Sequence, residues 1–174
     1  MNEPVSRRQP LPAQWSVRAG RDAYLRENGF TVAAYDDKIS RVKVFGLRIL
    51  LPNTAKRRNA IKMHDLHHVA TGFGTDLTGE AEVSAWELRR GIGGVGLYVR
   101  FLVTGLVAVG SLVAPRRTWG AWRRSGKRPS LFGRQGEYEH LLQMSIGELR
   151  RELDLPEAGL ARGERGLHGD APGA

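Results

Sequence analysis

The chain has no cysteine among its 174 residues. Disulfide bonds, zinc–thiolate sites and cysteine nucleophiles are therefore excluded. The first fourteen residues are polar and contain proline, and no apolar stretch follows their arginines, so no secretory signal is visible. We expect a cytoplasmic protein, and the length suits one domain with a substantial core.

Negative charge is missing from residues 88–136, which contain no aspartate and no glutamate. The same segment contains ten basic residues, whereas the net charge of the whole chain is +9. These basic residues are Arg89, Arg90, Arg100, Arg116, Arg117, Arg123, Arg124, Lys127, Arg128 and Arg134. One segment therefore accounts for the basic character of the chain.

A long apolar run without charge is also absent. Residues 91–114 are apolar except for Arg100, and the uncharged run from Phe101 to Pro115 has fifteen residues, whereas a membrane-spanning helix needs about 20. We therefore expect residues 91–124, which include Trp119 and Trp122, to contact an anionic membrane surface peripherally. The lining of an apolar tunnel and a buried core helix are the alternatives.

Nucleic acid is the other usual partner of a basic segment. Trp119 and Trp122 could stack on bases. No nucleic-acid-binding motif accompanies the charge, however, so we expect no nucleic-acid partner.

Histidine is scarce, yet three of the five histidines lie within residues 64–68. Three carboxylates follow closely, so that seventeen residues contain His64, Asp65, His67, His68, Asp76 and Glu80. This concentration of imidazoles and carboxylates is typical of a divalent-metal site. Structural histidines that cap helices or face solvent are the alternative interpretation.

Helix geometry predicts which of these side chains can meet. On a helix His64, Asp65 and His68 fall within an arc of about 100°. Gly72 and Gly74 should end that helix, and Asp76 or Thr78 can cap a second helix, which runs to about Arg90. Upstream, Ser16 is expected to cap a helix over residues 17–28, and Asn53 or Thr54 is expected to cap the helix that contains the histidines.

Glu80 would then lie in the first turn of the second helix and return over the histidine face. We predict a metal site of His64, Asp65, His68 and Glu80, with Asp65 and Glu80 as catalytic carboxylates, one of which can move protons instead of binding metal. Two imidazoles and two carboxylates favour Zn, Fe or Mn over Ca or Mg, and zinc is the first choice. His67 is expected in a supporting or solvent-facing position.

The motif resembles that of the Coq-four family of ubiquinone biosynthesis proteins, in a bacterial short form. The resemblance rests on the motif His64-Asp65-x-x-His68, which is followed after eleven residues by Glu80. The turn between them and the closing patterns at residues 137–139 and 146–153 also match. It covers residues 18–156. The region in front of the motif is shorter than in longer family members, which affects any partner contact made there.

The resemblance implies a metal-dependent lyase that removes the carboxyl group from a polyprenylated aromatic acid and hydroxylates the same ring carbon. It also implies a peripheral location on the inner face of the cytoplasmic membrane, a prenylated quinone precursor as ligand, and other quinone biosynthesis proteins and a homo-oligomer as partners. The alternative function is a non-catalytic, metal-containing scaffold that binds prenyl lipids.

The expected fold is mainly α-helical. We predict one helical metal-binding domain over residues 15–156, with disordered segments at 1–14 and 157–174, the latter including His168. Alternating apolar residues over 39–51 predict a small β-hairpin around Phe45 and Gly46. Residues 141–153 predict a final amphipathic helix.

Overall fold

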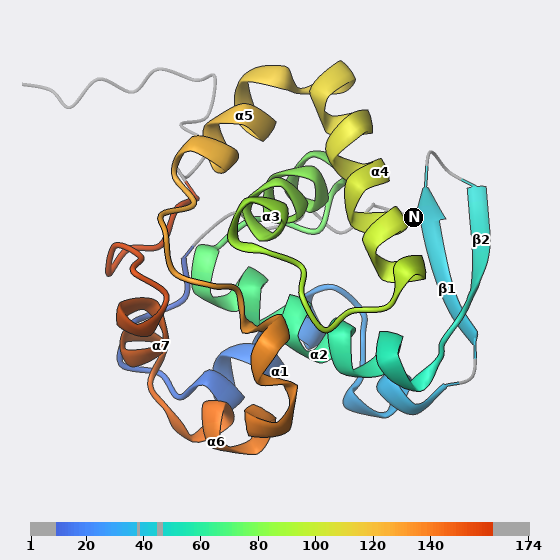
Figure 1. Ribbon diagram of the computed structural model, residues 1–174. Coiled ribbons are helices and arrows are strands. Elements are labelled where there is room, and N and C mark those ends of the chain that lie inside the picture. Colours follow the sequence, from blue (N-terminus) through green and yellow to red (C-terminus); the bar gives the residue numbers. More distant parts are fainter. Residues whose placement is uncertain (1–9, 38, 45–46, 162–174) are drawn as a thin grey trace, which may run out of the picture.

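The computed structural model describes residues 10–37, 39–44 and 47–161 (Figure 1). The predicted turn at Phe45 and Gly46, residues 1–9 and the segment 162–174 with His168 lie outside the described residues.

The described chain is mainly helical, which confirms the predicted fold class. The α-helices are α1 (Val17–Glu27), α2 (Ala55–Thr71), α3 (Leu77–Arg90), α4 (Leu97–Val113), α5 (Pro115–Arg123), α6 (Tyr138–Gln143) and α7 (Ile146–Glu152). Two short 3-10 helices, η1 (Val32–Asp36) and η2 (Leu131–Glu137), lie between them. The strands β1 (Ile39–Val44) and β2 (Leu47–Pro52) pair antiparallel as the predicted hairpin, with Val42 opposite Ile49.

The helices α2 and α3 begin and end where the caps predict. Thr54 accepts a hydrogen bond from the N–H of Arg57 at the start of α2. Gly72 ends α2 in the left-handed conformation, at φ 79°, which glycine adopts without steric cost. Asp76 caps α3 by accepting from the N–H of Gly79 at 2.7 Å. The cap therefore places Glu80 in the first turn of α3.

Helices α2 and α3 occupy the centre of the molecule (Figure 1). Helices α4 and α5 pack on α3, whereas α1, α7 and η2 pack on α2. Leu66 and Val69 of α2, Val83 and Trp86 of α3 and Ile146 of α7 are among the buried residues of one common core. Each of the two central helices is thus packed against other helices of the described chain.

The end of the chain differs from the prediction in one respect. The segment expected as a single helix over 141–153 is two helices, because α6 ends at Gln143 and Ser145 caps α7. Ser145 and Glu148 form a reciprocal capping box, in which each side chain bonds the backbone N–H of the other residue. The Ser-x-x-Glu sequence that specifies this break is visible in the chain.

The packed part of the chain is also wider than the predicted domain of residues 15–156. Gly147 donates its N–H to the carbonyl of Ala13, and Leu11 packs against the core. Leu160 is buried, and its N–H bonds the carbonyl of Thr71 at the end of α2. Residues 10–14 and 157–161, which were expected to be disordered, therefore belong to the folded structure.

Among the helices in the described ranges, none combines the length and the apolar character that crossing a membrane requires.

Candidate metal centre

Three of the four predicted ligands meet at the turn between α2 and α3. His64 Nε2 lies 3.1 Å from His68 Nε2 and 3.2 Å from Glu80 Oε2. Glu80 Oε1 lies 3.5 Å from His68 Nε2. In the described part of the chain these three residues form the group of histidine and carboxylate side chains that could hold a metal ion.

The hydrogen bonds of the histidines direct their Nε2 atoms toward this group. His68 Nδ1 lies 3.0 Å from the carbonyl oxygen of Phe73, which only accepts, so Nδ1 donates. His64 Nδ1 lies 2.8 Å from Glu87 Oε1, a carboxylate oxygen that also accepts. In neutral histidines both Nε2 atoms then have lone pairs that face each other and the carboxylate of Glu80.

A positive charge between the two Nε2 lone pairs and the carboxylate of Glu80 would stabilise this arrangement. Without one, two imidazole nitrogens and a carboxylate oxygen would repel each other at these distances. A proton on His64 would relieve the repulsion, and so would a metal ion. In a tetrahedral zinc site with bonds of 2.0–2.1 Å, two nitrogen ligands lie about 3.3 Å apart, close to the separation here. The residues present therefore fit a small divalent ion.

Glu87 is fully buried and supports both His64 and His67. His67 Nε2 accepts the backbone N–H of Leu131 at 3.0 Å, so its proton is on Nδ1, which donates to Glu87 Oε1 at 2.7 Å. A backbone amide of η2 is thus linked through His67 and Glu87 to His64. His67 belongs to this support and does not face solvent.

The histidines lower the pKa values of both carboxylates in this cluster, against the effect of burial. Burial by itself would raise the pKa of Glu87, but the neighbouring histidines lower it to about 2. Burial also opposes ionisation of Glu80, yet His68 and His64 hold its pKa well below the ordinary value. Both groups are therefore carboxylates at neutral pH, as metal binding and its support require.

Asp65, the fourth predicted ligand, does not belong to the group. Its Oδ2 accepts a hydrogen bond of 2.5 Å from the hydroxyl of Tyr35. Burial raises the pKa of Asp65, although His64 and the Tyr35 hydrogen bond act against this shift. The structure thus brings together three of the four predicted ligands and gives Asp65 a different neighbour.

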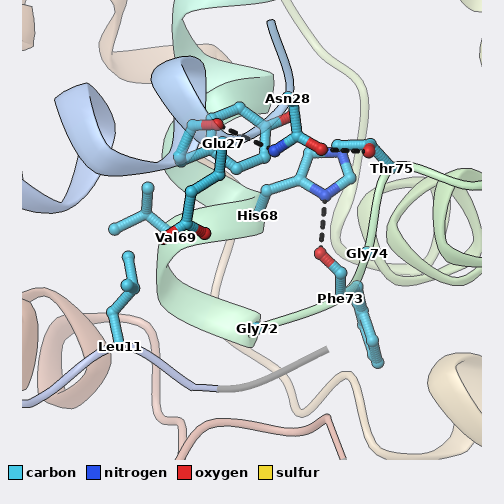
Figure 2. Close-up of a pocket in the computed structure, with 10 residues that line it drawn as sticks. Leu11, Glu27, Asn28, His68, Val69, Gly72, Phe73, Gly74 and Thr75 are labelled. Carbon is cyan, nitrogen blue, oxygen red and sulfur yellow. Dashed lines mark hydrogen bonds between the residues drawn. The ribbon is translucent and has the colours of Figure 1, made fainter. Parts of the chain in front are cut away.

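A small pocket adjoins the group on the side of His68 (Figure 2). Its volume is about 30 Å³, enough for a few water molecules. Tyr24 stacks on the His68 ring at a centroid distance of 5.3 Å, and Asn28 accepts a hydrogen bond from the hydroxyl of Thr75. The pocket does not have room for a prenyl chain.

On another side the group faces solvent. The side chains of His64 and Glu80 are 22% and 26% exposed, whereas that of His68 is buried. An ion held by these residues would therefore have a coordination position open to a ligand from outside.

Sequence reasoning missed Glu87 and Leu131 and assigned His67 only a general supporting position. Glu87 lies seven residues after Glu80, two helical turns further along the same face of α3, so its position beside α2 could have been inferred from helix periodicity. No local pattern indicates the contact of Leu131, which lies 64 residues after His67.

Comparison of the chain with models of protein families, with curated proteins and with solved structures finds no match.

Proposed function

We propose that His64, His68 and Glu80 hold one divalent metal ion, zinc in the first place and iron or manganese as alternatives, in an enzyme of quinone biosynthesis. The observation that carries the metal site is the convergence of two Nε2 lone pairs and a carboxylate within 3.5 Å. The resemblance of the motif to the Coq-four family supports the choice of reaction and substrate.

The proposed substrate is an aromatic acid with a polyprenyl chain. In the reaction the bond from the ring carbon to the carboxyl group breaks, carbon dioxide leaves, and a hydroxyl group forms at the same carbon. Dioxygen is the oxidant: each ring takes one oxygen atom, so two molecules of acid use one dioxygen. A bound zinc ion would bind and polarise the ring carboxylate, and a bound iron or manganese ion would in addition supply activation of dioxygen.

The residues of the chain have separate parts in this proposal. His64, His68 and Glu80 bind the ion and leave one side open to substrate. Glu87 and His67 orient His64. We assign proton exchange to Asp65, whose carboxylate accepts a hydrogen bond from the Tyr35 hydroxyl.

Metal content tests the site directly. Elemental analysis of the purified full chain should find close to one zinc, iron or manganese ion per molecule. The double variant His64→Ala/His68→Ala should lose it, whereas His140→Ala, which changes an exposed histidine of α6, should keep it. Retention of the metal in the double variant would refute the site as described.

Turnover tests the reaction. The metal-loaded protein, given a prenylated hydroxybenzoate-type acid and dioxygen, should release carbon dioxide and form the hydroxylated ring. A metal-containing protein that forms no product with zinc, iron or manganese would favour the non-catalytic scaffold that binds prenyl lipids.

A further inference from the structure

The helix α4 has two apolar faces, and only one of them packs on the protein. Val99, Val103, Val107 and Gly110 are buried on the side of α3. Leu97, Phe101, Ala108 and Leu112 point the other way, because at about 100° per residue they share an arc of about 60°. Figure 1 shows α4 on the outside of α3.

The outward residues of α4 are unusually exposed for large apolar side chains. Leu97 is 83% exposed, Phe101 77% and Leu112 84%. Together they form a stripe over four turns of the helix, which we call the outer stripe of α4. The exposed Thr104 lies between Phe101 and Ala108, so the stripe is two apolar patches on one side of the helix. Exposed apolar patches of this kind indicate a surface that binds a partner.

Positive charge surrounds the outer stripe. Arg100 lies on its edge, and Arg116 follows at the start of α5; both are exposed. Residues 88–136 contain no acidic side chain. An apolar stripe bordered by arginines complements an anionic surface with an apolar interior, which is the chemistry of a membrane with anionic lipids.

An exposed aromatic residue lies on α5, the helix that follows α4 in the chain. Trp119 of α5 is 44% exposed and packs edge-on against Trp122 at a centroid distance of 5.8 Å. Tryptophan favours the boundary between head groups and acyl chains, where its ring is in an apolar region and its N–H can bond water.

We propose that the outer stripe of α4, with Arg100, Arg116 and Trp119, is a docking surface for a membrane that contains anionic lipids. The helix lies along the membrane surface: the stripe enters the apolar boundary and the arginines contact phosphates. The inference goes beyond the metal reaction, since vesicle binding by this surface requires neither metal nor substrate.

Cosedimentation of the full chain with vesicles tests the proposal. Vesicles of phosphatidylcholine with phosphatidylglycerol should bind the protein at least tenfold more tightly than vesicles of phosphatidylcholine alone. Raising the salt concentration from about 0.1 M to about 1 M should weaken the binding, because it shortens the Debye length from about 10 Å to about 3 Å.

The variant Phe101→Ser/Leu112→Ser should lose at least tenfold in affinity for the anionic vesicles. The control Phe30→Ser/Val32→Ser removes two apolar side chains that are each 49% exposed but lie outside α4 and α5, and it should bind like the unchanged protein. Circular dichroism and thermal unfolding should agree for all three, because the changed side chains are exposed.

Three outcomes would overturn the proposal. The first is equal binding of the folded α4 variant and the unchanged protein, and the second is no binding of anionic vesicles at all. The third is a dimer in sedimentation equilibrium that the α4 variant dissociates, since a second copy would then cover the stripe. The His64→Ala/His68→Ala variant should bind vesicles normally, so that failure of the metal site and failure of this surface are told apart.

Discussion

Glu87 is the residue that sets the orientation of His64. One carboxylate oxygen accepts from His64 and from His67, and His67 in turn accepts from the backbone of Leu131. This arrangement holds the proton of His64 on Nδ1 and leaves the Nε2 lone pair available to a metal ion. Partners of this kind are a general feature of histidine ligands, because they select the tautomer and the ring orientation.

Changing Glu87 should therefore weaken metal binding although Glu87 touches no ion. Glu87→Gln retains the shape but can no longer accept from both histidines with the same oxygen. We expect about a tenfold to hundredfold loss of zinc affinity, measured by competition with a chelating dye. Glu82→Gln, on the same helix but bonded to Arg117, is the matched control and should keep its affinity. Equal loss in both variants would contradict the assigned role.

Asp65 has a different relation to the metal. Its bond to the Tyr35 hydroxyl and its absence from the group of three predict that Asp65→Asn keeps close to one metal per chain. Glu80→Gln should reduce the metal content. Elemental analysis of the two variants shows whether the metal has three protein ligands or four. If both variants lose the metal, Asp65 is a ligand as well.

At the scale of elements, the cap of α3 positions a ligand. Glu80 lies four residues after Asp76, and the N–H of Glu80 bonds the carbonyl of Asp76. The turn is tight: a Cβ atom at Gly79 would lie 2.1 Å from the carbonyl oxygen of Gly74. The approach of α3 to α2 thus depends on both the cap and the absence of a side chain at residue 79.

Removal of the cap should affect stability and metal binding together. Asp76→Ala should lower the free energy of unfolding by about 0.5–2 kcal/mol, as measured in urea. It should also weaken metal binding, because the first turn of α3 contains Glu80. Asp76→Asn keeps a capping oxygen and should retain most of both properties. A stable Asp76→Ala variant with normal metal affinity would show that packing alone places Glu80.

At the scale of the whole molecule, the end of the described chain returns to the site helix. Leu160 and Ala161 donate their N–H groups to the carbonyl of Thr71, in the last turn of α2. Arg124 of the segment after α5 donates to the carbonyl of Leu160. A segment expected to be disordered therefore closes the core beside the turn that joins α2 and α3.

The burial of Leu160 predicts a large effect of its removal. Leu160→Ala should destabilise the protein by about 2–5 kcal/mol, because it leaves a cavity in the core. Leu112→Ala removes the same atoms from an exposed position of α4 and should change the free energy of unfolding by less than about 0.5 kcal/mol. Urea unfolding of the two variants makes the comparison, and similar values would contradict the packed position of Leu160.

Much of the site could be predicted from the sequence because its spacing is local. The four-residue interval between His64 and His68 places both on one side of a helix, and Gly72 and Asp76 mark the reversal. The helix break before α7 is also encoded locally, because the Ser-x-x-Glu capping box at Ser145 starts a new helix within the apolar periodicity of residues 141–153.

The sequence by itself determined which side chains share a helical face and where the two metal-binding helices begin and end, because helix geometry and capping act within a few residues. Only the tertiary structure decided that Glu87 bonds His64 and is linked through His67 to the backbone of Leu131, that Tyr35 bonds Asp65, and that one face of α4 stays exposed. These contacts join residues 20 to 64 positions apart, and their formation depends on how whole helices pack, which no local periodicity encodes.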